Sequence, residues 1–409
     1  MKVGFQMKKA VVLSLAAVTA LSAGSIDEAF VAGKANGQIR AAYVSQNNDA
    51  TQDTYGSSIG GILKYETAEW NGLKLGAGAY VSQKIHAVTG KEGDNHLNTE
   101  LFDMDGKSYA YVGEAYVDYT MDKLNLKVGR QQLDTPFADT DDIRMHPNTF
   151  EAAIATYTGL EGSTFVGGYV KRWAGYDSED TLSKEQFKKL HEGSRGAAVF
   201  GVINESIENL NFQAWYYGVD KLADLTYLDA AYAIAFSETL GLEVSGQFAA
   251  FSEKTQEDGT KSDVHGSVYG IGAAFNAGAL TVGAAYNKGS NENGKTTPIG
   301  FGGGPYMTSM EEWTIEGMSD VKAYQLNAEL DLADAGLEGI TLSALYGNFK
   351  SDTDGTKVTE LDLIASFELS EAISGDISYA MIEDKNNNAD GSGGDAGYDR
   401  FLVRLNYNF

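Results

Sequence analysis

The sequence predicts an all-β protein, a transmembrane antiparallel β-barrel of about 18 strands with one loop folded inward as a constriction. Three observations support this prediction. Apolar and polar residues alternate along the final segment, similar segments recur through the chain, and the connections between them alternate between short and long. Successive side chains of a strand point to opposite faces, so each segment has one apolar and one polar face, as a wall between lipid and water requires.

The final segment, Tyr398 to Phe409, shows the alternation most clearly. Every second position from Phe401 to Phe409 is apolar, and the positions between them are mostly polar. An antiparallel strand on a soluble core has the same pattern. This strand, however, ends on an aromatic residue with Tyr407 two positions earlier, and aromatic residues flank the apolar band of membrane barrels. The segment therefore favours a barrel wall.

The first 23 residues have the pattern of a signal peptide. Met7-Lys8-Lys9 precede the apolar run Ala10 to Leu21, and small residues follow. This order is typical of export, and the run is too short to cross a bilayer as a helix. We expect a signal peptide at residues 1–23, a single barrel domain at residues 24–409, and a location in the outer membrane of a Gram-negative bacterium.

The remaining candidate strands follow in order along the chain. Together with the last strand they number about 18, and an even number places both termini on the periplasmic side. In the segment 108–119, the alternation places Tyr109 and Tyr111 on the lipid-facing side and Glu114 and Asp118 on the inner side. The candidate strands are 37–45, 58–66, 73–81, 108–119, 124–128, 151–158, 164–172, 196–204, 210–219, 226–236, 242–252, 267–276, 279–288, 321–331, 339–350, 358–368 and 374–384.

The connections sort into two sets. Short turns are expected at 69–72, 121–123, 159–163, 205–209, 237–241, 277–278, 332–338 and 369–373, and long connections at the other end. The longest of these covers about residues 289–320. Strands around 196–236 follow the alternation poorly, so the strand number is expected within two of 18.

Composition and charge restrict the function. The chain has 48 glycines, 4 prolines and no cysteine, which suits many tight turns and excludes disulfides and thiolate metal sites. Its net charge is −26, and loss of the signal peptide removes three lysines and no acid. Such acidity argues against binding nucleic acid. The acidic loops are either a solvated surface or a place for divalent cations near lipopolysaccharide, and we expect contact with outer-membrane lipid.

Strand parity predicts which charged residues line the lumen. Arg40 on the first strand and Arg400 and Arg404 on the last occupy inner positions, and these strands meet where a barrel closes. Lys64, Lys74 and Lys127 join them. Either the charges pair across strands and hold water, or a basic wall faces an acidic wall and orients charged solutes. The inner acids are Glu114, Asp118, Glu243, Glu329, Asp331, Asp362, Glu368 and Asp376.

The loop 133–150 is the candidate constriction. A polar loop of this length can fold into a barrel, where acidic side chains favour cations; the alternative is a solvated outer loop. Its charged residues are Asp134, Asp139, Asp141, Asp142, Arg144 and His146. Asp139, Asp141 and Asp142 are also weak candidates for a structural calcium site, although the glycine of an EF-hand loop is missing.

Several short motifs resemble one family, the OprD-type outer-membrane porins and the related major porins of epsilonproteobacteria. They are Gly129-Arg130-Gln131 with Thr135-Pro136, Asp142-x-Arg144-x-x-Pro147-x-Thr149-Phe150-Glu151, and the opening Asp27-Glu28-Ala29-Phe30 with Gly37-Gln38-Ile39-Arg40. The resemblance implies an 18-stranded pore, monomeric or trimeric, with the third loop folded inward and a basic ladder. Candidates for the ladder are Arg40, Arg130, Arg400 and Arg404.

The chain also departs from this family's pattern. Asp141 stands where the family often has Asn, Ala152 stands where Gly is usual, and the chain has only seven arginines. Anion preference is common in the family, but these features favour a preference for cations or weak selectivity. Small outward-facing residues would allow a homotrimer.

The expected function is passive diffusion of small hydrophilic solutes and ions through a water-filled barrel. The main alternative is an adhesive or structural barrel whose acidic loops bind a partner, and a soluble secreted β-sandwich is a further one. No Gly-x-Ser-x-Gly elbow is present, and the five histidines have no metal-ligand spacing, so we expect no enzyme. Calcium apart, no cofactor is expected.

Overall fold

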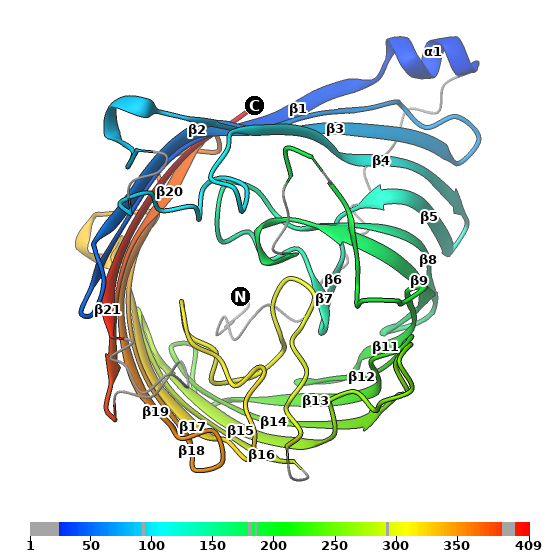
Figure 1. Ribbon diagram of the computed structural model, residues 1–409. Coiled ribbons are helices and arrows are strands. Elements are labelled where there is room, and N and C mark those ends of the chain that lie inside the picture. The colour runs from blue at the N-terminus through cyan, green and yellow to red at the C-terminus, as the bar shows by residue number, and fades with distance from the viewer. Residues whose placement is uncertain (1–23, 92–94, 179–181, 185, 292–293, 387–396) are drawn as a thin grey trace.

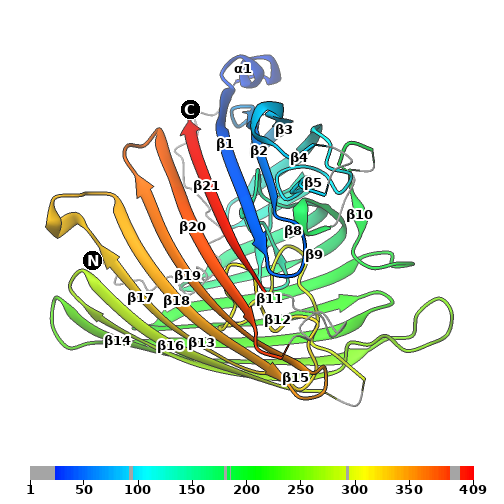
Figure 2. The same cartoon turned by 60° about the vertical axis from the view of Figure 1, so that its left-hand side comes forward.

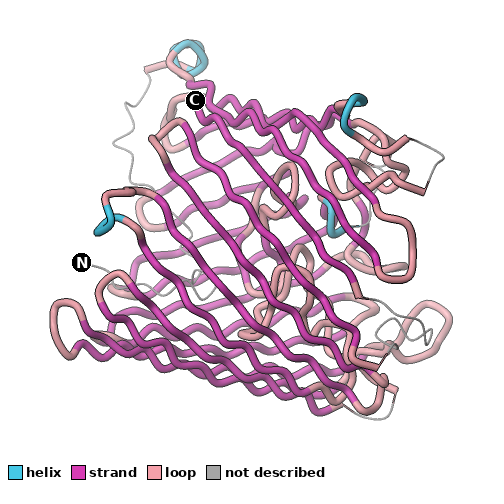
Figure 3. Tube along the Cα trace, turned by 90° about the vertical axis from the view of Figure 1, so that its left-hand side faces the viewer, coloured by secondary structure: helices cyan, strands magenta, loops and turns pink. Residues whose placement is uncertain are grey.

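Long antiparallel strands form the wall of a barrel. The structure is a computed structural model that describes residues 24–91, 95–178, 182–184, 186–291, 294–386 and 397–409. Within them one sheet has 19 strands, of which the two-residue β10 is a short addition, so 18 strands build the wall. The predicted strand number is therefore confirmed. Figure 1 looks into the barrel, and Figure 3 shows the strands crossing the wall obliquely.

The wall strands follow one another around the barrel in chain order. They are β1 (Lys34–Asn48), β2 (Thr54–Glu66), β3 (Leu73–Lys84), β4 (Tyr109–Met121), β5 (Leu124–Gln131), β8 (Thr149–Leu160), β9 (Ser163–Ala174), β11 (Ala197–Ile207), β12 (Leu210–Val219), β13 (Ala223–Ala235), β14 (Leu240–Glu253), β15 (Gly266–Ala277), β16 (Leu280–Ser290), β17 (Lys322–Asp331), β18 (Ile340–Ser351), β19 (Thr356–Glu368), β20 (Ile373–Asp384) and β21 (Tyr398–Asn408).

The barrel is closed by its first and last strands. β1 pairs with β21 from Gln38 opposite Asn408 to Asn48 opposite Tyr398. Closure leaves no unpaired strand edge, which is the condition for a sheet to exist within lipid. It also brings residues from the two ends of the sequence onto one seam, here called the closing seam and defined as β1 and β21. None of the helices in the described part of the chain is long and apolar enough to cross a membrane.

One end of the barrel carries short hairpin turns at the predicted positions. Asn71, Asp122 and Asn209 have φ of 50°, 53° and 62°, the left-handed conformation that tight hairpins require. Helix α1 (Ile26–Val31) lies at this end together with the end of β21 (Figure 2). The hydroxyl of Ser25 caps α1 by accepting a hydrogen bond from the Glu28 N–H. The predicted signal peptide, residues 1–23, lies outside the described residues.

The other end carries the long connections, among them 85–108, 132–148, 175–196 and 291–321. Three connections at this end, 49–53, 220–222 and 352–355, are short, so the predicted alternation of short and long is only partly right. The strands are longer than the sequence pattern indicated and take up the residues assigned to loops. β1, for example, continues to Asn48, and β2 begins at Thr54.

The two faces of the wall follow the predicted alternation. Ile39, Leu63 and Tyr407 are exposed on the outer face, whereas Arg40 and Arg400 are buried on the inner face. An outer face of apolar side chains is the surface that lipid covers.

Strand β4 is an exception to the predicted alternation. Glu114 pairs with Gly78 and Val112 pairs with Ala79, so Gly113 is an extra residue with no partner. Such a β-bulge shifts the parity of the residues beyond it. Val112 is exposed on the outer face, while Tyr109 and Tyr111 are buried. The prediction that both tyrosines face lipid is therefore wrong.

Two long loops fold into the barrel (Figure 1). The loop 132–148 contains the hairpin of β6 (Asp134–Thr135) and β7 (Ala138–Asp139), and it pairs with the loop 291–321. The Asp139 N–H donates to the Phe301 carbonyl at 2.9 Å, and the Phe301 N–H donates to the Phe137 carbonyl at 2.9 Å. The predicted inward position of the third long loop is thus confirmed by these contacts.

Apolar packing holds these loops against the wall. The side chain of Phe137 is fully buried and makes edge-to-face contacts with Tyr217, Tyr227 and Tyr306, with ring centroids 5.5, 6.1 and 6.2 Å apart. Aromatic pairs of this geometry add about 0.5–1.5 kcal/mol each beyond the burial of apolar area. Phe137 therefore anchors the loop 132–148 to one side of the lumen, while its far end reaches the closing seam.

Candidate functional site at the constriction of the barrel

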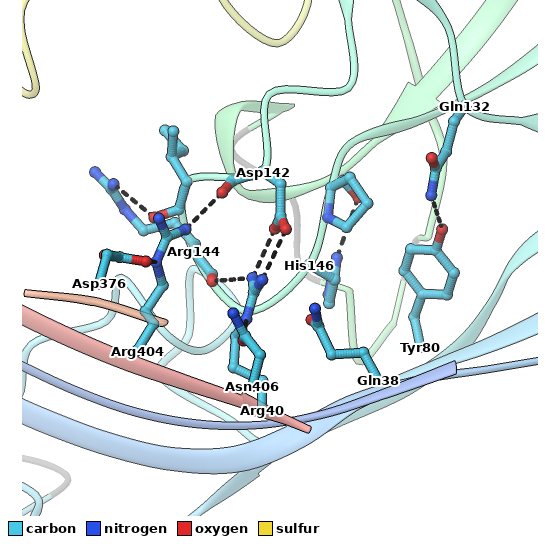
Figure 4. A network of polar contacts seen from close by, with 12 residues as sticks. Gln38, Arg40, Tyr80, Gln132, Asp142, Arg144, His146, Asp376, Arg404 and Asn406 are labelled. Carbon is cyan, nitrogen blue, oxygen red and sulfur yellow. Dashed lines mark hydrogen bonds and ion pairs between the residues drawn. The ribbon is translucent and has the colours of Figure 1, made fainter. Parts of the chain in front are cut away.

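Asp142 fixes the loop 132–148 to the closing seam (Figure 4). Its carboxylate accepts two hydrogen bonds from Arg40, from Nη1 at 2.6 Å and from Nη2 at 2.7 Å. This two-pronged geometry is the strong form of the arginine–carboxylate pair. Arg40 also donates to Asn406 Oδ1 at 2.7 Å and to the Arg144 carbonyl at 2.7 Å, and Arg404 donates to the Asp142 carbonyl. One buried guanidinium group therefore joins β1, β21 and the loop.

A second cluster lies on the same seam and joins two further loops. Arg400 Nη2 lies 2.7 Å from Glu100 Oε2, and Arg400 Nη1 lies 3.2 Å from Glu312 Oε1. Arg144 approaches the same two carboxylates at 3.1 and 3.6 Å. Glu100 belongs to the loop 85–108 and Glu312 to the loop 291–321. Three loops and the wall thus meet through two guanidinium and two carboxyl groups.

The arginines of the lumen are matched by carboxylates. Arg404 completes the set through Asp376, with Nε 2.9 Å from Oδ1. The arginines Arg40, Arg144, Arg400 and Arg404 therefore face four acids, which are Glu100, Asp142, Glu312 and Asp376. The prediction that the three wall arginines gather on one seam agrees with this geometry. Of the two interpretations of the wall charges, pairing describes these residues.

The loop carboxylates of these clusters respond differently to their surroundings. Burial alone would raise the pKa of Asp142, but the hydrogen bonds and charge of Arg40 outweigh it, so the pKa is lowered. In the same way burial is outweighed at Glu100, where Arg144 and Arg400 lower the pKa. Burial prevails at Glu312 and raises its pKa. As pH falls, Glu312 therefore takes up a proton before Glu100 does.

His146 anchors the other side of the loop in a cage of aromatic rings. The rings of Tyr80, Tyr109 and Tyr111 lie 5.0, 5.3 and 5.5 Å from the imidazole ring, between centroids. Tyr109 Oη and His146 Nε2 are 2.5 Å apart. Burial lowers the pKa of His146 to about 4, so the imidazole is neutral at pH 7. The sequence pattern placed His146 among the charged constriction residues, whereas the bulge in β4 supplies it with a cage.

The predicted lysines Lys64, Lys74 and Lys127 lie on strands β2, β3 and β5. Lys64 Nζ lies 3.1 Å from Glu114 Oε2, and Lys127 Nζ lies 3.9 Å from the centroid of the Tyr116 ring. Glu114 also accepts a hydrogen bond of 3.0 Å from Tyr80. Asp118 accepts a hydrogen bond of 2.6 Å from Asn125. Of the predicted acidic wall residues, Glu114 therefore pairs with Lys64, and Asp118 lies on the same part of the wall.

Arg130 lies apart from the arginines of the seam. It pairs with Glu151 at 3.2 Å, and Glu151 also binds Arg172 at 2.6 Å. On β5, the half-buried Lys127 and the buried Gln131 lie on the same face of the strand, and Arg130 belongs to the opposite face. The expectation that Arg130 joins the basic ladder of the pore wall does not agree with this placement.

The remaining loop acids have separate surroundings. Asp134 accepts a hydrogen bond from the Thr140 hydroxyl, and burial raises its pKa. Asp141 has a φ of 31°, in the left-handed region that tight bends use. Calcium at Asp139, Asp141 and Asp142 stays a prediction. The pairing of the Asp142 carboxylate with Arg40 does not favour it. Among the described residues, no group of three or more His, Asp or Glu side chains is placed to hold a metal ion.

The loop 132–148 borders two cavities. The larger, about 710 Å³, is lined by Thr135, Pro136 and residues of the wall, and the smaller, about 400 Å³, by Thr140, Pro147 and residues of β1 and β2. Arg404 is the basic residue of the larger cavity. Its acids are Asp139, Asp229, Glu243, Glu311, Glu329 and Asp376.

Sequence reasoning missed Glu100, Glu312 and the tyrosine cage. The strand pattern assigns no role to Glu100 or Glu312. Their positions depend on how two long loops fold back over the seam, which no local pattern reports. A glycine within an otherwise regular strand was the available signal for the bulge at Gly113.

A closed barrel with an apolar exterior, a polar lumen and two loops folded inward defines a membrane channel of the outer-membrane type. The chain belongs to the OprD family, because the profile described as "outer membrane porin, OprD family" matches residues 28–390. It is therefore a porin, a channel for small solutes in the outer membrane and not an enzyme.

Solved structures with the same fold come from Pseudomonas aeruginosa. OpdQ has 17% identity and a TM-score of 0.74, with 92% of this chain and 98% of that chain covered. OccK1 (OpdK) has 16% identity and a TM-score of 0.76, with the same coverage of 92% and 98%. A double variant of OccD1 (OprD) has 19% identity and a TM-score of 0.69, with 92% and 95% covered. At these identities the likeness concerns the fold. No match is found among curated proteins.

Proposed function

We propose that this porin is a passive diffusion channel with a modest preference for cations. The observation that supports the proposal is the lining of the larger cavity, where six carboxyl groups face one guanidinium group, that of Arg404. Arg404 is itself paired with Asp376. Acidic side chains on a pore wall raise the local concentration of cations and lower that of anions.

The paired arginines also support weak selectivity. An anion that entered the lumen would have to compete with Asp142 for Arg40 and with Glu100 for Arg400, both of which are held at 2.7 Å or less. At physiological salt the Debye length is about 8 Å, so unpaired wall carboxylates influence ions only close to the wall. The preference is therefore expected to be modest and to weaken as salt rises.

The test is the reversal potential of the refolded protein in a planar bilayer with potassium chloride at two concentrations. We expect single-channel steps and a reversal potential of the cation-favouring sign. The double variant Glu243→Gln with Glu329→Gln should shift the reversal potential toward zero. Glu208→Gln, in the exposed turn between β11 and β12, is the matched control and should leave it unchanged.

Each other outcome has a definite meaning. A clear anion preference in the parent protein would contradict the proposal and move the selecting role to the arginines of the seam. No steps from a folded barrel would favour the adhesive or structural alternative instead.

We also propose that the end with hairpin turns and α1 faces the periplasm, and that the barrel assembles as a homotrimer in lipid and lipopolysaccharide. An even strand number and short turns at that end support the orientation. Cross-linking in the native membrane tests the oligomer, since a monomer band alone would contradict it.

A further inference from the structure

Glu360 and Asp362 place two buried carboxyl groups side by side on the inner face of β19. They are two residues apart, so they share a face of the strand, and both residues have 0% of their surface exposed. The Asp362 Oδ1 atom is buried and has no hydrogen-bond partner among the described residues, so a proton can sit there. Neither Glu360 nor Asp362 has an ion pair in the described part of the chain, in contrast to the carboxylates of the closing seam.

These two side chains hold the segment 309–313 of the long loop 291–321. The Glu311 N–H donates to Asp362 Oδ2 at 3.1 Å. The next two N–H groups, of Glu312 and Trp313, donate to the two oxygens of Glu360 at 2.9 and 2.8 Å. Three successive backbone donors of one loop therefore end on two side chains of the wall.

The packing around the segment is equally close. Gln325 on β17 donates to the Ser309 carbonyl at 2.8 Å. Met310 lies over Gly347 on β18, where a Cβ atom would come within 2.8 Å of the Met310 Cγ atom. Trp313 packs against Phe349, with ring centroids 6.3 Å apart. The two carboxyl groups therefore supply the hydrogen-bond acceptors for three N–H groups of the segment at this depth.

The charges that face the pair are mostly negative. The wall residues opposite Glu360 and Asp362 on β18 and β20 are Gly347, Leu345, Ile382 and Ala380, which carry no charge. The titratable groups on the elements packed around the pair are Glu311 and Glu312 of the loop, Asp384 of β20, Tyr398 and Arg400 of β21, Arg144 and Glu100. Arg144 and Arg400 are both engaged with Glu100 and Glu312.

We propose that Glu360 and Asp362 share a single proton and that this proton latches the segment 309–313 to the wall. Two ionised carboxylates at this depth, without a cationic partner, would repel each other and lose their hydration, so one proton between them is the stable arrangement. Loss of the proton at alkaline pH places a second negative charge beside Glu311 and Glu312. The segment then leaves the wall, and because Ser309 and Glu311 line the larger cavity, the lumen widens.

The test is the single-channel conductance of the refolded full-length protein as a function of pH, at constant high salt. The parent protein should keep one step size at neutral pH and show larger or noisier steps above an alkaline threshold. Asp362→Asn should lose this rise, since its amide nitrogen donates the hydrogen bond that the shared proton supplies and its amide oxygen still accepts from the Glu311 N–H. Glu368→Gln, also a change from carboxyl to amide but at the exposed end of the same strand, should retain the rise.

A second measurement separates loop movement from a direct effect of charge on the current. The chain has no cysteine, so Met310→Cys with Gly347→Cys offers a clean cross-link between the segment and β18. The alkaline rise should be lost in the oxidised protein and return on reduction. A rise that persists in Asp362→Asn, or in the oxidised protein, would overturn the proposal, as would a step size that does not change with pH. The readout is step size and not reversal potential, so it is independent of the proposed ion preference.

Discussion

On the closing seam, Arg40, Arg400 and Arg404 each lie against a carboxylate, whereas Glu243 and Glu329 on the wall from β13 to β17 line the cavity without an ion pair among the described residues. The arginines of the seam thus form ion pairs, two of them with carboxylates that belong to loops. The carboxyl groups of Glu243 and Glu329 on the other wall border the cavity instead. Charge type alone therefore does not tell which residues select ions, because pairing decides which charges a solute encounters.

The loop 132–148 is attached to the wall in two ways, by an ion pair and by aromatic packing. At the seam, the attachment of Asp142 is ionic and sensitive to the loss of either partner. Elsewhere, rings attach the loop, Phe137 to β12 and β13 and His146 to β3 and β4. A two-pronged arginine–carboxylate pair fixes direction as well as distance, while ring packing stabilises mainly through burial of apolar area.

The largest effect is expected from breaking the ionic attachment with Arg40→Ala. This removes the four hydrogen bonds that the buried Arg40 guanidinium donates, two of them to the Asp142 carboxylate, and we expect a loss of about 3 kcal/mol in the free energy of unfolding. The loop should detach from the seam and the single-channel conductance should rise. Thermal unfolding in detergent and bilayer recording measure the two effects.

The matched control for this change is Arg195→Ala. Arg195 also contacts a carboxylate, that of Asp220 at 3.1 Å, but its side chain is 85% exposed. Exposed pairs contribute little, so the unfolding midpoint and the conductance should both stay unchanged. Equal effects of the two substitutions would show that the seam does not hold the loop.

A somewhat smaller effect is expected on the aromatic side, from the titration of His146. In an unfolded chain this imidazole binds a proton near pH 6.5, but in the folded protein burial lowers its pKa to about 4. The unfolded state therefore holds more protons between these values. The free energy of unfolding should fall by about 2–3 kcal/mol as pH drops from about 6.5 to 4 and then level off with respect to this group.

The variant His146→Phe isolates this contribution. It keeps a ring in the cage of Tyr80, Tyr109 and Tyr111 but cannot bind a proton. The unfolding midpoint of the variant should depend less on pH between 4 and 6.5 than that of the parent protein. An identical pH profile in both would mean that His146 does not titrate in this window.

The strands of the wall can be predicted from the sequence because their alternation of apolar and polar residues is a local pattern. The period of two along a strand depends on neighbouring residues only, and it placed Arg40, Arg400 and Arg404 inside. Closure of the barrel then brings the first and last strands together, so the gathering of these arginines also follows from the sequence.

The partners of the arginines could not be predicted in the same way. Glu100 and Arg400 are 300 positions apart in the chain, and their contact depends on the path of a long loop. A single extra residue at Gly113 reversed the predicted faces of Tyr109 and Tyr111. Local alternation cannot count an inserted residue, because only the pairing with the neighbouring strand shows it.

The smallest effect, a change in ion preference alone, sharpens the comparison between paired and unpaired charges. Asp376→Asn removes one carboxylate of the cavity and also frees Arg404, whereas Glu329→Gln removes one carboxylate with no ion pair among the described residues. Both variants change the formal charge by one unit. Asp376→Asn should shift the reversal potential further toward anions, because it exposes a positive charge in addition to removing a negative one.

The two variants have the same net charge. They differ in whether the remaining Arg404 guanidinium still has a carboxylate partner. The side chains of Arg404 and Asp376 are 16% and 18% exposed, so Asp376→Asn should also lower the free energy of unfolding, by about 1–2 kcal/mol. If both variants shifted the reversal potential equally, net charge would govern selectivity, and the distinction between the seam and the opposite wall would not matter for ions. A larger shift for Asp376→Asn would show that an arginine of this channel acts on solutes only when its carboxylate is removed.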